Sequence, residues 1–67
     1  MAKEYIKTFE GIILGSMEDM GDRIEARDFG GRLLGWYDKG TDTTRDFYGR
    51  ILYQGNAVSS LITHPED

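Results

Sequence analysis

The chain has 67 residues and a formal net charge of −4, with 12 acidic and 8 basic side chains, no cysteine and one histidine. A chain of this length forms one small domain, here 1–67, and buries only about 60% of the surface that its unfolded state exposes. The composition excludes a disulfide framework and a thiolate zinc site, and the negative charge disfavours general binding to nucleic acids and anionic membranes.

Turn signals every eight to ten residues predict a meander of short strands. We expect strands near residues 3–8, 12–18, 22–28, 32–38, 42–46 and 50–55. Asn56 is a suitable N-cap for a short helix over 56–62 that ends before Pro65, and residues 63–67 form a mobile tail. The predicted fold class is all-β: an antiparallel meander of about six short strands in three hairpin repeats, over residues 5–55, with a short C-terminal helix.

A six-residue pattern occurs three times and locates the hairpin turns. Its copies are Phe9–Leu14, Phe29–Leu34 and Phe47–Leu52. The last two extend to a shared Arg-Asp-Phe-x-Gly-Arg-(Leu/Ile)-Leu. Asp at the first position and Gly at the fourth are typical of a type I turn that closes with glycine at positive φ, as in a three-residue hairpin loop with a glycine bulge. This loop places Asp and Arg opposite each other as an ion pair. The predicted turn residues are Asp28, Gly31, Arg32, Asp46, Gly49 and Arg50.

The same register predicts the faces of the sheet. Ala26 is expected opposite Leu34, and Ile24 opposite Trp36, on an apolar face. By the same count Ile6 faces Leu14 and Thr44 faces Leu52. The other face of the second hairpin carries Arg23, Glu25 and Arg27.

The first copy of the pattern lacks the ion pair. Thr8 and Ile12 take the places of the Asp and the Arg, so the turn geometry is expected to persist without the charges. An apolar Ile12 indicates that this end of the sheet is more buried or lies at a subunit contact.

The Asp-x-x-Gly-Arg units resemble those of short bacterial hairpin-repeat proteins, of which the four-fold β-flower type is one. The resemblance covers roughly residues 5–55 and includes the segment Gly35–Asp38 as the strand after such a turn. It implies a bacterial source and a hairpin-repeat fold, and it implies no reaction. Copies spaced unequally, by twenty and then eighteen residues, depart from strict rotational symmetry.

Catalytic and cofactor motifs are absent from the sequence. The single histidine, His64, lies in the tail, and no phosphate loop or paired-cysteine motif occurs. The acidic loops Glu18–Asp22 and Asp38–Asp42 lack the full acidic series of a calcium site. We therefore predict no enzyme activity, no cofactor and no bound metal.

The aromatic residues are the candidate interface. Phe29, Phe47 and Tyr48 fall at hairpin tips, where they either curl onto the core or insert into a neighbour. The candidate interface residues are Phe29, Trp36, Tyr37, Phe47, Tyr48 and Tyr53. Together with arginines they also suggest a face on which nucleic-acid bases could stack. The arginines of that face are Arg23, Arg27, Arg32, Arg45 and Arg50.

We expect a non-enzymatic, self-associating protein-interaction module. Oligomerisation supplies the stability that a small domain without disulfides or metals lacks, and it covers the edge strands near 3–8 and 50–55. A protein partner is compatible with this function, and nucleic acid is disfavoured by the net charge. One alternative is a small acidic inhibitor, encoded by a mobile element, that occupies a basic site on a host nucleic-acid enzyme. Another is a single-stranded nucleic-acid binder.

The chain contains no apolar run long enough to span a bilayer and no signal peptide, so no membrane association is expected. The absence of cysteine is consistent with a reducing compartment. We expect a cytoplasmic protein.

Overall fold

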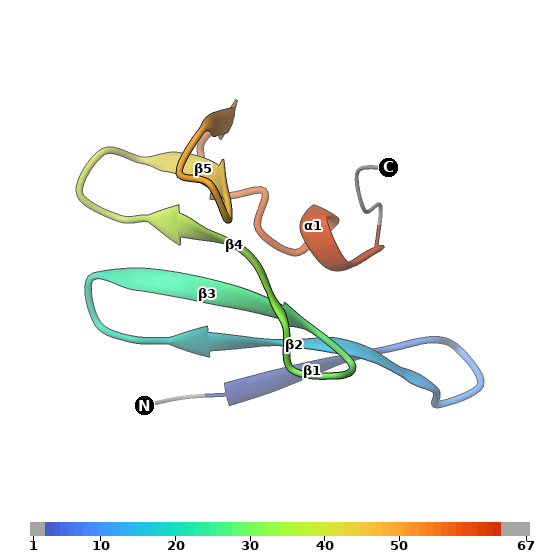
Figure 1. The fold of residues 1–67 in the computed structure, drawn as a ribbon. Helices are drawn as coiled ribbons and strands as arrows, with labels where there is room; N and C mark the ends of the chain where they lie inside the picture. The colour runs from blue at the N-terminus through green and yellow to red at the C-terminus, as the bar shows by residue number, and fades with distance from the viewer. Residues whose placement is uncertain (1–2, 64–67) are drawn as a thin grey trace.

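A computed structural model describes residues 3–63 of the chain. Within this range the elements are β1 (Lys3–Lys7), β2 (Ile13–Asp19), β3 (Arg23–Asp28), β4 (Leu33–Asp38), β5 (Thr43–Asp46), β6 (Ile51–Gln54) and α1 (Ser60–Thr63). Each strand pairs antiparallel with the next, so one open sheet has the order β1-β2-β3-β4-β5-β6 (Figure 1). The predicted all-β meander with a short C-terminal helix is confirmed, and β1 and β6 are its edges.

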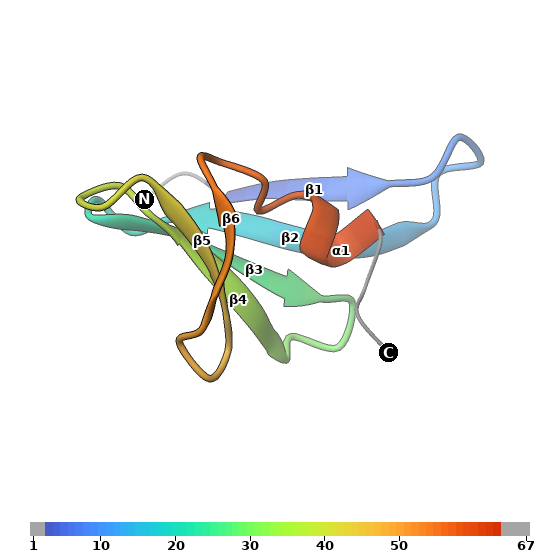
Figure 2. The ribbon, with the colours of Figure 1, turned by 90° about the horizontal axis from the view of Figure 1, so that it is seen from above.

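The sheet twists strongly along its length, as antiparallel sheets of short strands do. The β1–β2, β3–β4 and β5–β6 loops leave the same end of the meander and fan apart because of this twist (Figure 2). The β2–β3 and β4–β5 loops lie together at the opposite end, where the amide of Lys39 donates to the carbonyl of Asp22 at 3.2 Å.

The three fanned loops share one backbone geometry. In the second loop the amide of Gly31 donates to the carbonyl of Asp28 at 3.0 Å, and the amide of Asp28 donates to the carbonyl of Arg32 at 3.0 Å. A side-chain oxygen also caps the turn, since Asp28 Oδ1 accepts from the amides of Gly30 and Arg32 at 2.9 Å each. The closing glycines all have the positive φ that this turn needs; they are Gly11 (91°), Gly31 (91°) and Gly49 (89°).

The predicted cross-strand register beyond the turns is wrong by one residue. Ala26 lies opposite Gly35 and Arg27 lies opposite Leu33, so Leu34 is an extra, unpaired residue between them. The observed partners replace each predicted one: Ile24 faces Tyr37 and not Trp36, Ile6 faces Gly15 and not Leu14, and Thr44 faces Tyr53 and not Leu52. A bulge re-aims the side chain of the extra residue, and in every hairpin that residue is a leucine that packs against the core: Leu14, Leu34 and Leu52.

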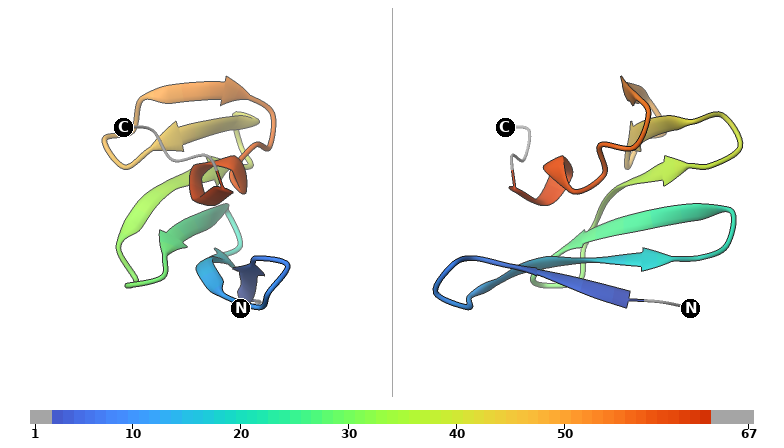
Figure 3. Two further views of the ribbon diagram at one scale, coloured as in Figure 1. Left: turned by 90° about the vertical axis from the view of Figure 1, so that its right-hand side faces the viewer. Right: turned by 180° about the vertical axis from the view of Figure 1, so that it is seen from behind.

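The core lies between α1 and one face of the sheet. Its buried apolar residues are Ala26, Val58, Leu61 and Ile62. The helix crosses the middle of the sheet, over β2, β3 and β4 (Figure 3). A single short helix therefore covers this face, and the buried core is small for a chain of this length.

Two glycines let the helix approach the sheet closely. A Cβ at Gly35 would meet the carbonyl oxygen of Arg45 and would lie 2.7 Å from Leu61 Cδ1, and a Cβ at Gly15 would meet the carbonyl oxygen of Arg27 and would lie 3.0 Å from Ile62 Cγ2. Gly15 and Gly35, which we call the glycine floor, occupy equivalent positions in the first two hairpins. No side chain other than hydrogen fits there.

A buried hydroxyl directs the chain from β6 back over the sheet. Thr44 is fully buried, and its Oγ1 donates to the carbonyl of Gly55 at 2.7 Å and accepts from the amide of Ala57 at 2.9 Å. Asn56 Oδ1 accepts from the amide of Val58 at 3.2 Å, so Asn56 caps the turns that lead into α1.

The helix differs from its predicted bounds of 56–62. The residues directly after Asn56 form turns, and α1 begins only at Ser60. The helix includes Thr63, which the sequence predicts to lie in the tail. The predicted mobility of 64–67, with His64 and Pro65, concerns residues outside those that the structure describes.

Candidate interaction surface

The hairpin tips expose large apolar side chains. Phe29, Phe47 and Tyr48 are 81%, 54% and 73% exposed, so the tips do not curl onto the core. Phe9 is 104% exposed and Ile12 is 63% exposed, which makes the more buried alternative for the first tip wrong. We call these five residues the tip surface. The structure brings them to one end of the meander, on three separate loops.

The third tip is the most organised of the three. The rings of Phe47 and Tyr48 pack together with centroids 4.1 Å apart, and the guanidinium of Arg50 lies over the Tyr48 ring at 5.5 Å. Arg50 Nε in turn donates to Asp46 Oδ2 at 2.8 Å. The turn, the ion pair and both aromatic rings therefore form one contiguous unit.

The ion pair of the second tip is looser. Arg32 Nε lies 3.7 Å from Asp28 Oδ2, and the Arg32 side chain is 82% exposed. The same sequence motif thus gives a tight pair in the third hairpin and a loose pair in the second.

Asp46 combines burial with several hydrogen-bond donors. Burial alone would raise its pKa, but the backbone amide of Arg50, the guanidinium of Arg50 and the amide of Tyr48 together outweigh burial and hold the pKa below the ordinary value. The carboxylate is therefore charged wherever this tip is formed at neutral pH.

The other candidate interface residues lie away from the tips. The Tyr37 ring packs against the core, and its hydroxyl donates to Asp42 Oδ1 at 2.6 Å; this hydrogen bond is the main cause of its raised pKa. Trp36 lies on the opposite, outer face of the sheet, with the Arg23 guanidinium 5.1 Å from its ring. Tyr53 is on the edge strand β6 and is 42% exposed.

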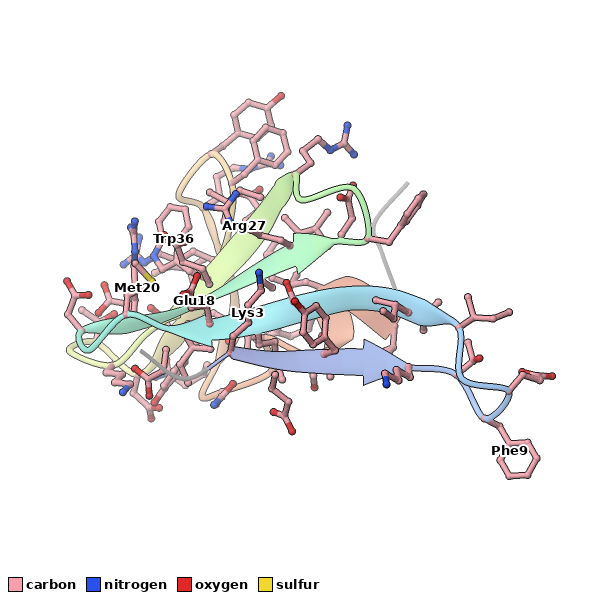
Figure 4. All side chains as sticks on the ribbon, turned by 90° about the horizontal axis from the view of Figure 1, so that it is seen from below. Lys3, Phe9, Glu18, Met20, Arg27 and Trp36 are labelled. Atoms are coloured by element: carbon pink, nitrogen blue, oxygen red, sulfur yellow. The ribbon has the colours of Figure 1, made fainter. Side chains whose placement is uncertain are left out.

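The outer face carries a row of charges along β3. Glu25 is buried to 6% exposure and pairs with Arg23 at 2.7 Å and with Arg27 at 3.2 Å. Arg27 and Trp36 project from this face together with Lys3, Glu18 and Met20 (Figure 4). The predicted separation of Trp36 from the arginines is wrong, because the bulge shifts Trp36 to the position opposite Glu25.

The first arginine of the motif has a structural role that sequence reasoning missed. Arg27 Nη1 donates to the carbonyl of Gly31 at 2.9 Å, and Arg45 Nη1 donates to the carbonyl of Gly49 at 2.9 Å. The signal was present, since both copies of the motif begin with Arg. Every arginine of the suggested base-stacking face thus has a partner within the chain.

Two carboxylates at the acidic end of the sheet have partners within the chain. Asp19 accepts from the amide of Gly21 at 2.9 Å and pairs with Lys39 Nζ at 2.9 Å, and these two contacts, in that order, lower its pKa. Asp38 Oδ1 accepts from the amide of Gly40 at 2.9 Å. These carboxylates act as turn caps and ion-pair partners.

An open groove of about 660 Å³ separates the β1–β3 side of the sheet from the segment before α1. Its lining mixes polar and apolar side chains: Lys3, Glu4, Met17, Asp19, Ile24, Asn56, Val58 and Ser59. Among residues 3–63, no group of three or more His, Cys, Asp or Glu side chains is placed to hold a metal ion. None of the helical structure within those residues has the length and apolar character needed to cross a bilayer.

Comparisons with protein-family models, with curated proteins and with solved structures found no match to this chain.

Proposed function

We propose that this chain is a non-enzymatic, self-associating protein-interaction module that uses the tip surface as its contact surface. The observation that carries the proposal is the exposure of Phe9, Phe29 and Tyr48, each above 70% on a loop end. Aromatic side chains are enriched at interfaces, and these three stand at loop ends where little of their own subunit covers them.

The small core supports the same proposal. Four apolar residues are buried within the described part of the chain, whereas ten large apolar residues are exposed there. Burying one large apolar side chain contributes roughly 1.5–3 kcal/mol. Association through the tips therefore offers stabilisation that the isolated subunit lacks.

The two alternatives have weaker support. A nucleic-acid face needs several available guanidinium groups, and four of the five arginines lie within 2.9 Å of a carboxylate or a carbonyl of their own chain, which leaves only the loosely paired Arg32. An acidic inhibitor needs a cluster of available carboxylates, and two carboxylates of the acidic stretch, Asp19 and Glu25, are in ion pairs within the chain. A salt-dependent titration with a single-stranded oligonucleotide tests the first alternative.

The proposal is tested by measuring mass in solution. We expect the wild-type protein to be a homo-oligomer at micromolar concentration by light scattering and native mass spectrometry. The combined variant Phe9→Ser, Phe29→Ser, Phe47→Ser should be a monomer with an unchanged circular dichroism spectrum. Met20→Ser is the matched control, because it replaces an exposed apolar side chain at the opposite end of the sheet. A wild-type monomer, or an oligomer that withstands the combined variant, would reject the proposal.

A further inference from the structure

The first hairpin presents an unsupported aromatic ring. Phe9 stands at the end of the β1–β2 loop, which projects well beyond the rest of the molecule (Figure 4), and its side chain is 104% exposed. The neighbouring Glu10 is also exposed. We call Phe9 and Glu10 the knob. A ring in this position contributes nothing to the fold of its own subunit.

A matching hollow lies between the other two hairpins. Arg32, Leu33 and Phe47 line a mainly apolar notch of about 400 Å³. One wall of it is held in place, because Phe47 packs on Tyr48, Arg50 covers Tyr48, and Asp46 fixes Arg50 at 2.8 Å. A rigid aromatic wall lowers the entropic cost of binding a second ring.

The rim of the notch is positively charged. Arg32 is only loosely paired with Asp28, at 3.7 Å, and is 82% exposed, so its guanidinium retains donors for a second carboxylate. The knob supplies a carboxylate next to its ring. The apolar hollow of the notch can therefore receive the ring of Phe9, and the guanidinium of Arg32 at its rim can receive the carboxylate of Glu10.

We propose that Phe9 of one copy inserts into the notch of a second copy, and that Glu10 of the first copy accepts hydrogen bonds from Arg32 of the second. This contact rests on the self-association proposed above and specifies its geometry. The β1–β2 loop diverges from the β3–β4 and β5–β6 loops (Figure 2), whose hairpins line the notch, so the notch takes the knob of another copy.

The contact has a consequence for assembly. Each copy carries one knob and one notch, so two copies can exchange knobs across a two-fold axis, or each copy can bind the next one head to tail. Repeated head-to-tail contacts of this kind close into a ring or continue as a filament. Sedimentation velocity distinguishes the two-fold dimer from these larger assemblies.

The decisive experiment compares exposed apolar residues at the two ends of the sheet. Phe9→Ser should weaken self-association at least about tenfold, as loss of a buried aromatic anchor does. Met20→Ser, at the opposite end of the sheet and outside the tip surface, is the control and should remain within about twofold to threefold of the wild-type dissociation constant, as residues outside an interface do. Sedimentation velocity measures both.

A charge exchange tests the orientation. Arg32→Glu alone and Glu10→Arg alone should each weaken association, and an equimolar mixture of the two variants should restore it, because each altered residue then meets a complementary partner. Both residues are exposed, so the variants are expected to keep the fold, which circular dichroism checks. A wild-type oligomer that is indifferent to Phe9→Ser, or a mixture that does not recover, overturns the knob-and-notch contact and leaves self-association standing. A wild-type monomer overturns both.

Discussion

The first hairpin and the third have the same turn and different chemistry. The amide of Thr8 donates to the carbonyl of Ile12 at 2.8 Å, and the amide of Asp46 donates to the carbonyl of Arg50 at 3.0 Å. In the first turn Thr8 Oγ1 caps the amide of Ile12 at 3.1 Å, where the third turn uses a carboxylate. A capping side-chain oxygen and a glycine at positive φ are thus sufficient to form the loop. The Asp and Arg charges are not needed for the turn and instead change the chemistry of its surface.

The hairpins also differ where they meet the helix. The residue after the bulged leucine is Gly15 in the first hairpin, Gly35 in the second and Tyr53 in the third. The two glycines lie beneath α1, whereas Tyr53 is 42% exposed on an edge strand. The residue type at this repeat position is therefore determined by the local packing against the helix and not by the turn.

The largest effect is expected from breaking the glycine floor. Gly35→Ala forces a Cβ against the carbonyl oxygen of Arg45 and to within 2.7 Å of Leu61 Cδ1, so the strand pairing or the helix must shift. We expect a loss at the upper end of the about 1–3 kcal/mol typical of overpacking. Tyr53→Ala, at the equivalent position of the third hairpin, should cost much less. Urea denaturation measures the free energy of unfolding of both variants. Equal losses would contradict the close helix packing that we assign to the glycine floor.

A medium effect is expected at the closing glycines. Gly11→Ala and Gly49→Ala place a Cβ on a residue with φ near 90°, where no neighbouring atom interferes, so the cost is conformational and about 1 kcal/mol in each. Gly30→Ala is the control, since its φ is not in the left-handed region. Similar losses at both closing positions, despite the missing ion pair in the first hairpin, would show that the turn depends on its glycine and not on the charges. A loss confined to Gly49 would show that the charges set the turn.

The smallest effect concerns the ion pairs themselves. The pKa of Asp46 is lowered in the folded state, so its contribution to stability is present above the ordinary value of 3.8 and is lost as the pH falls through the folded-state pKa. Wild-type protein should therefore lose more stability than Asp46→Asn when acidified below that value. At neutral pH, Asp28→Asn should destabilise the protein less than Asp46→Asn does, because Arg32 Nε lies 3.7 Å from Asp28 Oδ2 and the Arg32 side chain is exposed. Thermal melts between neutral pH and pH values below 3.8 check both predictions. An identical acid response of wild type and Asp46→Asn would show that the Asp46 charge does not contribute to stability.

The order of the strands and the turn positions could be predicted because both depend on local chemistry. Turn glycines and capping oxygens act within four residues, and the observed strands differ from the predicted ranges by about one residue at their ends. The register could not be predicted in the same way. It depends on whether Leu34 reaches the core beneath α1, which is a tertiary contact made by residues far along the chain.

The candidate surface was only partly predictable. Tip aromatics such as Phe29 follow from the motif, because a residue at the second position of a tight loop projects outward. The faces on which Trp36 and Tyr37 lie could not be predicted, because these two residues exchange faces once the bulge is included. The notch was not predictable, because it forms between two hairpins whose relative placement depends on the twist of the sheet.

The glycine floor also bears on the order of folding. Every strand pairs with its neighbour in the chain, and such short-range contacts form quickly. The contact between Gly15 in β2 and Ile62 in α1 instead joins residues near the two ends of the described chain. During synthesis the meander can assemble as each hairpin emerges, while the bare backbone of the floor stays open to water until Leu61 and Ile62 arrive. We therefore expect sheet formation to precede the burial of the core, with helix docking as the last step.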